Sequence, residues 1–173
     1  EYLLSLNSKK FLYEFYKVAG LTPPTTEGYQ GWERSNDINF RGHTFGHYMS
    51  ALSQAYKGTG DAGVKAELLV QIKDAVEGLK ACQDAYGKNH PDSAGYVSAF
   101  REDILNKVDG TGGSNENVIV PWYNLHKVLA GLIDIYTFVD DKATADVALE
   151  IAENFSEYVY KRCSKLSDKT VML

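Results

Sequence analysis

The sequence predicts an all-α fold in which helical hairpins form an arc of a toroid. Apolar residues recur at helical spacing in five stretches, and no segment alternates strictly enough between apolar and polar residues to indicate a strand. A shift of eighty residues superposes Leu52 on Leu132 and Tyr56 on Tyr136, which indicates a weak internal repeat. The repeating unit is an inner helix, a short turn, an outer helix and a long return loop, as in an α/α toroid.

The first predicted helix covers about residues 5–18. It should end at Gly20, because the two prolines at 23–24 do not allow the helix to continue. A long loop then runs to about Gly42 and includes a segment at 28–33 that is rich in glycine and aromatic residues. Such loop segments line binding sites more often than they fill cores.

Two hairpins account for most of the remaining chain. The second and third helices are predicted at about 44–57 and 62–85, and the glycine-containing turn at 58–61 joins them into an αα-hairpin. A second long loop follows at about 86–120, with a short helix at 99–107.

The second hairpin begins at Pro121, which occupies the first-turn position that proline favours in a helix. The tight Asp140-Asp141 turn ends this fourth helix and leads to the fifth, at about 143–163.

Composition excludes two classes of partner. A formal net charge of -5 and a pI near 5.4 provide no basic surface for nucleic acid or an anionic membrane. No apolar run is long enough to span a bilayer, and 173 residues suit one cored domain. The only cysteines, Cys82 and Cys163, lie within helical patterns and form either buried thiols or one disulfide; we expect buried thiols.

The toroid would bring the two long loops to one face, because its inner helices run parallel and both loops lead into their N-termini. Polar and aromatic side chains from both loops should therefore converge there, and three of the four histidines are among them. The first loop delivers Trp32, Glu33, Arg41, His43 and His47, and the second delivers Trp122, Tyr123 and His126.

These residue types indicate a pocket for a small polar ligand such as a sugar. A histidine in the first turn of a helix tends to stay neutral, so one ring nitrogen donates and the other accepts a hydrogen bond. Aromatic faces can pack on the C–H face of a sugar ring, while Glu33 and Arg41 could orient its hydroxyl groups.

Each candidate also has a structural interpretation. His43 and His47 have the spacing of a zinc pair, but no third ligand is evident, so we expect no metal site in this chain. His126 would suit a hydrogen-bonded position in the core, and Trp32 and Trp122 could anchor loops.

Several ordered motifs resemble the N-terminal part of the β-L-arabinofuranosidase families, glycoside hydrolase families 127 and 146. They are residues 31–33 (GWE), 41–52 (RGHTFGHYMSAL), Cys82-Gln83, 95–100 (GYVSAF) and 120–132 (VPWYNLHKVLAGL). The resemblance covers nearly the whole chain. It implies that residues 1–173 form the N-terminal half of an (α/α)6 barrel, as a fragment of a longer protein with β-sandwich domains beyond the barrel.

The resemblance also implies a retaining hydrolysis of terminal β-L-arabinofuranosyl groups of plant-type glycans or glycoproteins. Members of these families use a cysteine thiolate nucleophile held at zinc, with a glutamate as acid/base. Neither Cys82 nor Cys163 matches those cysteines, so we expect no catalytic residue here, no bound zinc and no hydrolysis by the fragment alone. His126 best matches a sugar-contacting histidine, and His43, His47, Trp32 and Glu33 match the pocket wall.

Partners and alternatives follow from the same comparison. We expect a carbohydrate substrate, a secreted or cell-surface bacterial parent, and either a homodimer through apolar inner faces or an exposed apolar surface. Two other functions stay open at this point. One is a non-catalytic module that binds carbohydrate or protein, and the other is a different enzyme on the same toroid, such as an epimerase or an unsaturated-uronyl hydrolase.

Overall fold

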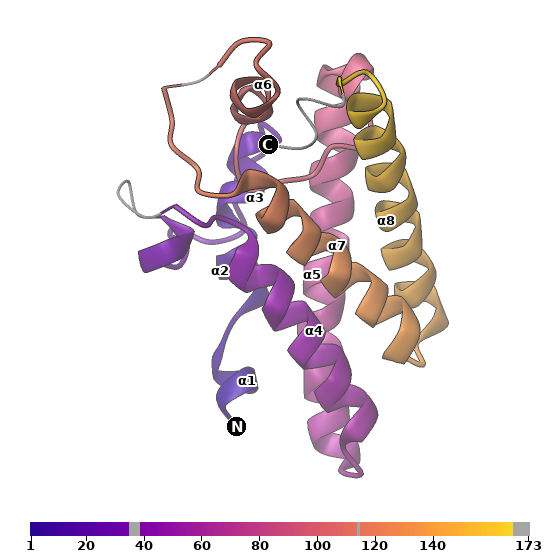
Figure 1. Ribbon diagram of the computed structural model, residues 1–173. Coiled ribbons are helices and arrows are strands. Elements are labelled where there is room, and N and C mark those ends of the chain that lie inside the picture. Colours follow the sequence, from indigo (N-terminus) through magenta and orange to yellow (C-terminus); the bar gives the residue numbers. More distant parts are fainter. Residues whose placement is uncertain (35–38, 114, 168–173) are drawn as a thin grey trace.

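A computed structural model of the chain describes residues 1–34, 39–113 and 115–167, and every regular element in that part is helical (Figure 1). The predicted all-α class is therefore confirmed. In chain order the elements are α1 (Tyr2–Ser5), α2 (Ser8–Phe11), α3 (Tyr13–Val18), η1 (Gly31–Glu33), α4 (His43–Gly58), α5 (Ala62–Asn89), η2 (Pro91–Ser93), α6 (Asp103–Asp109), α7 (Pro121–Phe138) and α8 (Lys142–Cys163).

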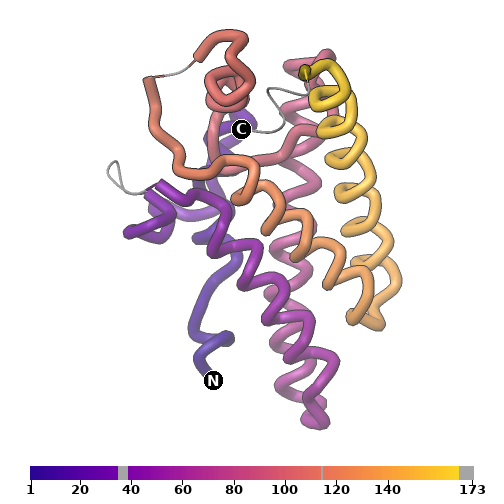
Figure 2. The backbone as a smooth tube through the Cα atoms, in the orientation of Figure 1, coloured from indigo at the N-terminus to yellow at the C-terminus, as the bar shows by residue number. Residues whose placement is uncertain are grey.

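The two predicted hairpins are α4 with α5 and α7 with α8. Figure 1 and Figure 2 show α4 and α7 side by side and running in the same direction; α5 passes behind them and α8 lies to the right of α7, and both run back. Contacts join α4 to α7, α5 to α8 and the two helices of each hairpin. The described part of the chain is thus an arc of two helical layers, consistent with a fragment of an α/α toroid.

Two glycines allow the inner helices α4 and α7 to touch. A Cβ on Gly46 would lie 2.3 Å from the carbonyl carbon and oxygen of Lys127, and one on Gly131 would lie 2.8 Å from the carbonyl oxygen of Gly46. Since backbone atoms cannot move aside as a flexible side chain can, this close crossing requires glycine on both helices.

Equivalent aspartates begin both outer helices. The Asp61 side chain accepts hydrogen bonds from the backbone N–H groups of Gly63 and Val64 at the start of α5, at 2.8 and 3.0 Å. Eighty residues later, Asp141 accepts from the backbone N–H of Thr144 at the start of α8, at 3.2 Å. Both are N-caps, so the weak repeat in the sequence corresponds to the same structural role in the two hairpins.

The single helix predicted at 5–18 is wrong, because α1 ends at Ser5 and the rest of that stretch forms two short helices, α2 and α3. The Asn7 side chain accepts from the backbone N–H of Lys9 at 2.8 Å and begins a new helix at Ser8. Ser8 is buried, and its hydroxyl donates to the carbonyl oxygen of Gln71 on α5 at 2.7 Å. These bonds tie the start of α2 to the outer layer and stop α1 from extending. The predicted end at Gly20 is correct, since Gly20 adopts the left-handed conformation.

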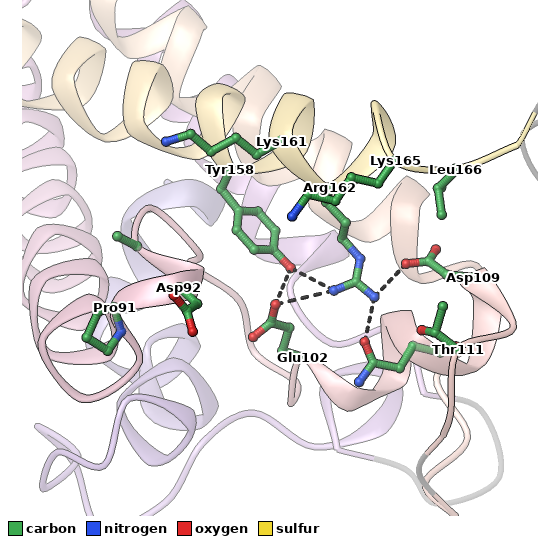
Figure 3. Close-up of a pocket in the computed structure, with 12 residues that line it drawn as sticks. Pro91, Asp92, Glu102, Asp109, Thr111, Tyr158, Lys161, Arg162, Lys165 and Leu166 are labelled. Atoms are coloured by element: carbon green, nitrogen blue, oxygen red, sulfur yellow. Dashed lines mark hydrogen bonds and ion pairs between the residues drawn. The ribbon is translucent and has the colours of Figure 1, made fainter.

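The second long loop is folded against α8 by Arg162. Its guanidinium lies 3.3 Å from Glu102, donates to Asn106 at 2.8 Å and lies 2.5 Å from Asp109 (Figure 3). A polar cleft of about 280 Å³ lies beside this network. The short helix predicted at 99–107 begins later, at Asp103, because the buried chain before it is bent, with the Phe100 carbonyl oxygen accepting from the Tyr96 hydroxyl at 2.7 Å and the Phe100 N–H donating to the Ser98 hydroxyl at 3.2 Å.

Buried side chains from both layers form one core. Both cysteines are free thiols; Cys82 is buried within the core as expected, whereas Cys163 is only partly buried, so the expectation of two buried thiols holds for Cys82 alone. In the described ranges, none of the helices is both long and apolar enough to cross a membrane. The core comprises, among others, Phe11, Phe15, Phe45, Met49, Leu52, Ile72, Leu79, Tyr96, Phe100, Leu132, Ile135 and Phe155.

The side of α7 that faces away from the core carries apolar side chains. Tyr123, Ile133 and Tyr136 are each more than two-fifths exposed, as is Val120 just before the helix. The expected exposed apolar side chains are present on this inner helix, and homodimer formation through them stays a prediction.

Candidate functional site

Two histidines lie one turn apart on α4, at the end where both long loops arrive. The ring centroids of His43 and His47 are 4.7 Å apart and the rings are nearly perpendicular. His47 is exposed. His43 is partly buried, and its Nδ1 atom is buried without a hydrogen-bond partner. A donor or acceptor on an incoming ligand could satisfy that nitrogen only after a small movement of the ring.

Aromatic rings from both loops surround His43. The Tyr123 ring, from the first turn of α7, stacks on it at 5.4 Å between centroids, and Trp32 and Phe40 lie at 6.2 and 5.8 Å. Trp32 is 55% and Tyr123 43% exposed, so part of each side chain is accessible to a ligand. We call His43, His47, Trp32, Phe40 and Tyr123 the histidine–aromatic cluster.

The electrostatics of the cluster favour neutral imidazoles. Burial lowers the pKa of His43 below its usual value, and His47 and Lys127 lower it further. Burial and Lys127 likewise lower the pKa of His47. Lys127 lies one turn after Tyr123, with its Nζ 4.7 Å from the centre of the tyrosine ring. Near neutral pH each histidine therefore offers one donor and one acceptor, as the sequence predicts.

Glu33 lies behind the cluster and not in its open face. It is buried, and its two carboxylate oxygens accept hydrogen bonds from the backbone N–H groups of Gly42 and Thr44, each at 2.9 Å. Burial raises the pKa of Glu33, while these bonds and the Arg41 guanidinium oppose the rise. Both oxygens are committed to the start of α4, which leaves Glu33 poorly placed to orient a sugar hydroxyl.

The two long loops are joined through Asn39 and Arg41, the residues on either side of Phe40. The backbone N–H of Ile119 donates to the carbonyl oxygen of Asn39 at 2.9 Å, and the Arg41 guanidinium forms an ion pair with Glu116. Arg41 is thus engaged within the protein. The chain then turns into α7 through Val120, a non-glycine residue in the left-handed region, with φ 44°. Such a conformation is strained and is retained only where surrounding contacts impose it.

His126 and Trp122 occupy different sides of α7. His126 is exposed and lies three residues after Tyr123, so it shares the open side of the helix with that ring. Trp122 is half-buried and packs against the core, which agrees with an anchoring role. Trp32, His43, His47 and Tyr123 are brought together, with His126 on the adjoining turn.

Phe40 is a member of the cluster that sequence reasoning missed. Its ring lies 5.5 Å from that of Trp32, and its backbone N–H donates to the carbonyl oxygen of Trp32 at 2.9 Å. Only its position just ahead of the histidine helix could have indicated it.

No group of three or more His, Cys, Asp or Glu side chains is arranged to hold a metal ion within the part of the chain that the structure describes. Zinc binds cysteine in its thiolate form. Cys82 is buried in the core, and burial raises the pKa of its thiol far above the usual value, so it does not offer a thiolate. The described residues therefore do not fit a zinc site.

A family model described as the beta-L-arabinofuranosidase, GH127 catalytic domain, matches residues 1–172. None of the curated proteins is similar enough in sequence to count as a match.

Proposed function

We propose a sugar-binding role for this chain on the premise that it belongs to the GH127 β-L-arabinofuranosidase catalytic-domain family. Membership of this family makes the chain part of a glycoside hydrolase catalytic domain. Our proposal adds that the histidine–aromatic cluster is part of the wall that holds a terminal β-L-arabinofuranosyl group, from plant-type glycans or glycoproteins.

The observation that carries the proposal is the pairing of neutral histidines with partly exposed aromatic rings. His43 and His47 present imidazoles whose pKa values are lowered, and a neutral imidazole can donate to one hydroxyl and accept from another. Tyr123 and Trp32 are partly exposed beside them. Flat apolar surface beside a few well-placed polar atoms is the usual composition of a sugar-sized site. His126 extends the same surface by one turn of α7.

Bond cleavage requires groups other than those described here. A cysteine nucleophile must be a thiolate, and Cys82 is held as a buried thiol within the core. Cys163 is only partly buried, but burial and the nearby Asp109 raise its pKa as well. We therefore propose that this chain binds the sugar and that a longer parent protein supplies the zinc and the hydrolytic residues. We further propose that the parent is a secreted or cell-surface bacterial enzyme that acts on extracellular glycans.

The activity test compares this chain with its full-length parent on p-nitrophenyl β-L-arabinofuranoside, with and without added zinc. We expect hydrolysis by the parent only. Hydrolysis by the chain alone would contradict the assignment of the chemistry to other residues. No hydrolysis by either protein would favour another toroid enzyme or a binding module.

A further inference from the structure

We propose that Glu33 is a positioning residue that fixes the histidine pair and the Trp32 ring relative to each other, without touching the sugar. The inference rests on the proposed sugar-binding role of the cluster and assigns one member of the predicted pocket wall a different task.

The first step concerns the N-terminus of α4, which has no side-chain cap from its own N-cap residue. The helix begins after Gly42, which has φ 86° and no side chain to accept a hydrogen bond from the first turn. The first N–H groups of a helix need partners from outside it. Glu33 supplies two of these bonds from η1, to the N–H of Gly42 and of Thr44. His43 lies between those two residues.

The second step is the neighbour of Glu33 in sequence. Trp32 is held by the same short helix, and its carbonyl oxygen accepts from the backbone N–H of Phe40 at 2.9 Å. The 3-10 helix η1 is therefore hydrogen-bonded to the segment before α4 through Phe40, and to the start of α4 through Glu33. This arrangement sets the 6.2 Å separation between the Trp32 and His43 rings.

The third step is charge and burial. Glu33 is only 7% exposed, so a sugar on the open face cannot reach its carboxylate. Both oxygens accept from N–H donors, which matches an ionised carboxylate, and a negative charge at a helix N-terminus is favoured by the helix dipole. Arg41 also contributes positive charge nearby. A neutral amide at position 33 would turn its NH2 group toward one of these donors and lose that bond.

The test compares Glu33→Gln with the wild-type chain by NMR. The matched control is Glu27→Gln, since Glu27 is an exposed carboxylate paired with Lys10. We expect Glu33→Gln to shift one of the Gly42 and Thr44 amide protons upfield and to weaken the Trp32–His43 ring nuclear Overhauser effect. Affinity for methyl β-L-arabinofuranoside should fall about tenfold, equivalent to about 1.4 kcal/mol. The control should change none of these.

Three results would overturn the inference. Unchanged ring contacts and unchanged affinity in Glu33→Gln would remove the positioning role. Lost affinity with unchanged amide shifts and ring contacts would show that Glu33 touches the sugar directly. Rapid hydrogen exchange of the Gly42 and Thr44 amides in the wild-type chain would refute the cap without any variant, so a failure of Glu33→Gln to fold leaves the inference testable. If the wild-type chain binds no sugar, the proposed function fails, while the amide shifts and ring contacts still decide the role of Glu33.

Discussion

Replacing Gly46 by alanine tests whether the close crossing of α4 and α7 organises the site. The new Cβ would lie 2.3 Å from the Lys127 carbonyl group and 2.7 Å from the Val128 nitrogen, all backbone atoms. Overpacking costs about 1 to 3 kcal/mol, and a clash with backbone atoms that cannot move aside belongs in the upper part of that range, at about 2 to 3 kcal/mol; the better helix propensity of alanine returns about 1 kcal/mol. We expect a net loss of about 1 to 2 kcal/mol in the free energy of unfolding.

The assay is urea and thermal unfolding followed by circular dichroism. A loss of about 1 to 2 kcal/mol corresponds to a fall in Tm of about 2 to 8 °C for a chain of this size. Gly58→Ala, at the end of the same helix, is the matched control, since nothing lies within 4 Å of its added Cβ. It should be neutral or slightly stabilising. Unfolding of Gly46→Ala within about 0.5 kcal/mol of wild type would refute the close crossing.

Four further outcomes follow from single contacts. Asp61→Ala should destabilise the chain by about 1 kcal/mol in urea unfolding through loss of the α5 cap. Cys82 should resist a thiol reagent at pH 8 until the chain unfolds, while Cys163 reacts sooner. Because burial lowers the pKa of His43, the unfolded chain binds more protons than the folded one just below the usual value of 6.5. Stability should therefore fall as the pH drops through that window, while sugar affinity should fall only at the lower pH at which His43 of the folded chain itself takes up a proton, measured by unfolding and NMR titration. Sedimentation should show a concentration-dependent dimer that Ile133→Asp abolishes, since this exposed residue lies on the apolar side of α7.

The hairpins could be predicted from sequence because their signals are local. Apolar periodicity marks α4, α5, α7 and α8, and the glycine and aspartate turns mark where each hairpin reverses. The eighty-residue repeat also predicts parallel inner helices, and with them the meeting of the two long loops. Those features place His43 near Tyr123, although they are distant in sequence.

The helix predicted at 5–18 is interrupted by a local hydrogen bond that competes with helix continuation. Asn7 interrupts an apolar pattern that otherwise reads as continuous, and its side chain begins a new helix at Ser8. The bonds from Ser8 to Gln71 are tertiary and leave no periodic trace in the sequence.

The positioning role that we propose for Glu33 could not be predicted from the sequence for a similar reason. A carboxylate beside a tryptophan in a glycine-rich loop resembles a ligand contact, and its burial depends on how η1 approaches α4. The one available signal was Gly42, a residue without a side chain at a helix start, which requires a cap from elsewhere.

The most direct test of the central claim is an NMR titration of this chain with methyl β-L-arabinofuranoside. We predict saturable shifts centred on the imidazole signals of His43 and His47 and the ring signals of Tyr123 and Trp32, with signals from the Arg162 network unchanged. Absence of saturable shifts in the histidine–aromatic cluster, or shifts centred on the cleft beside Arg162, would contradict the assignment of the sugar-binding wall.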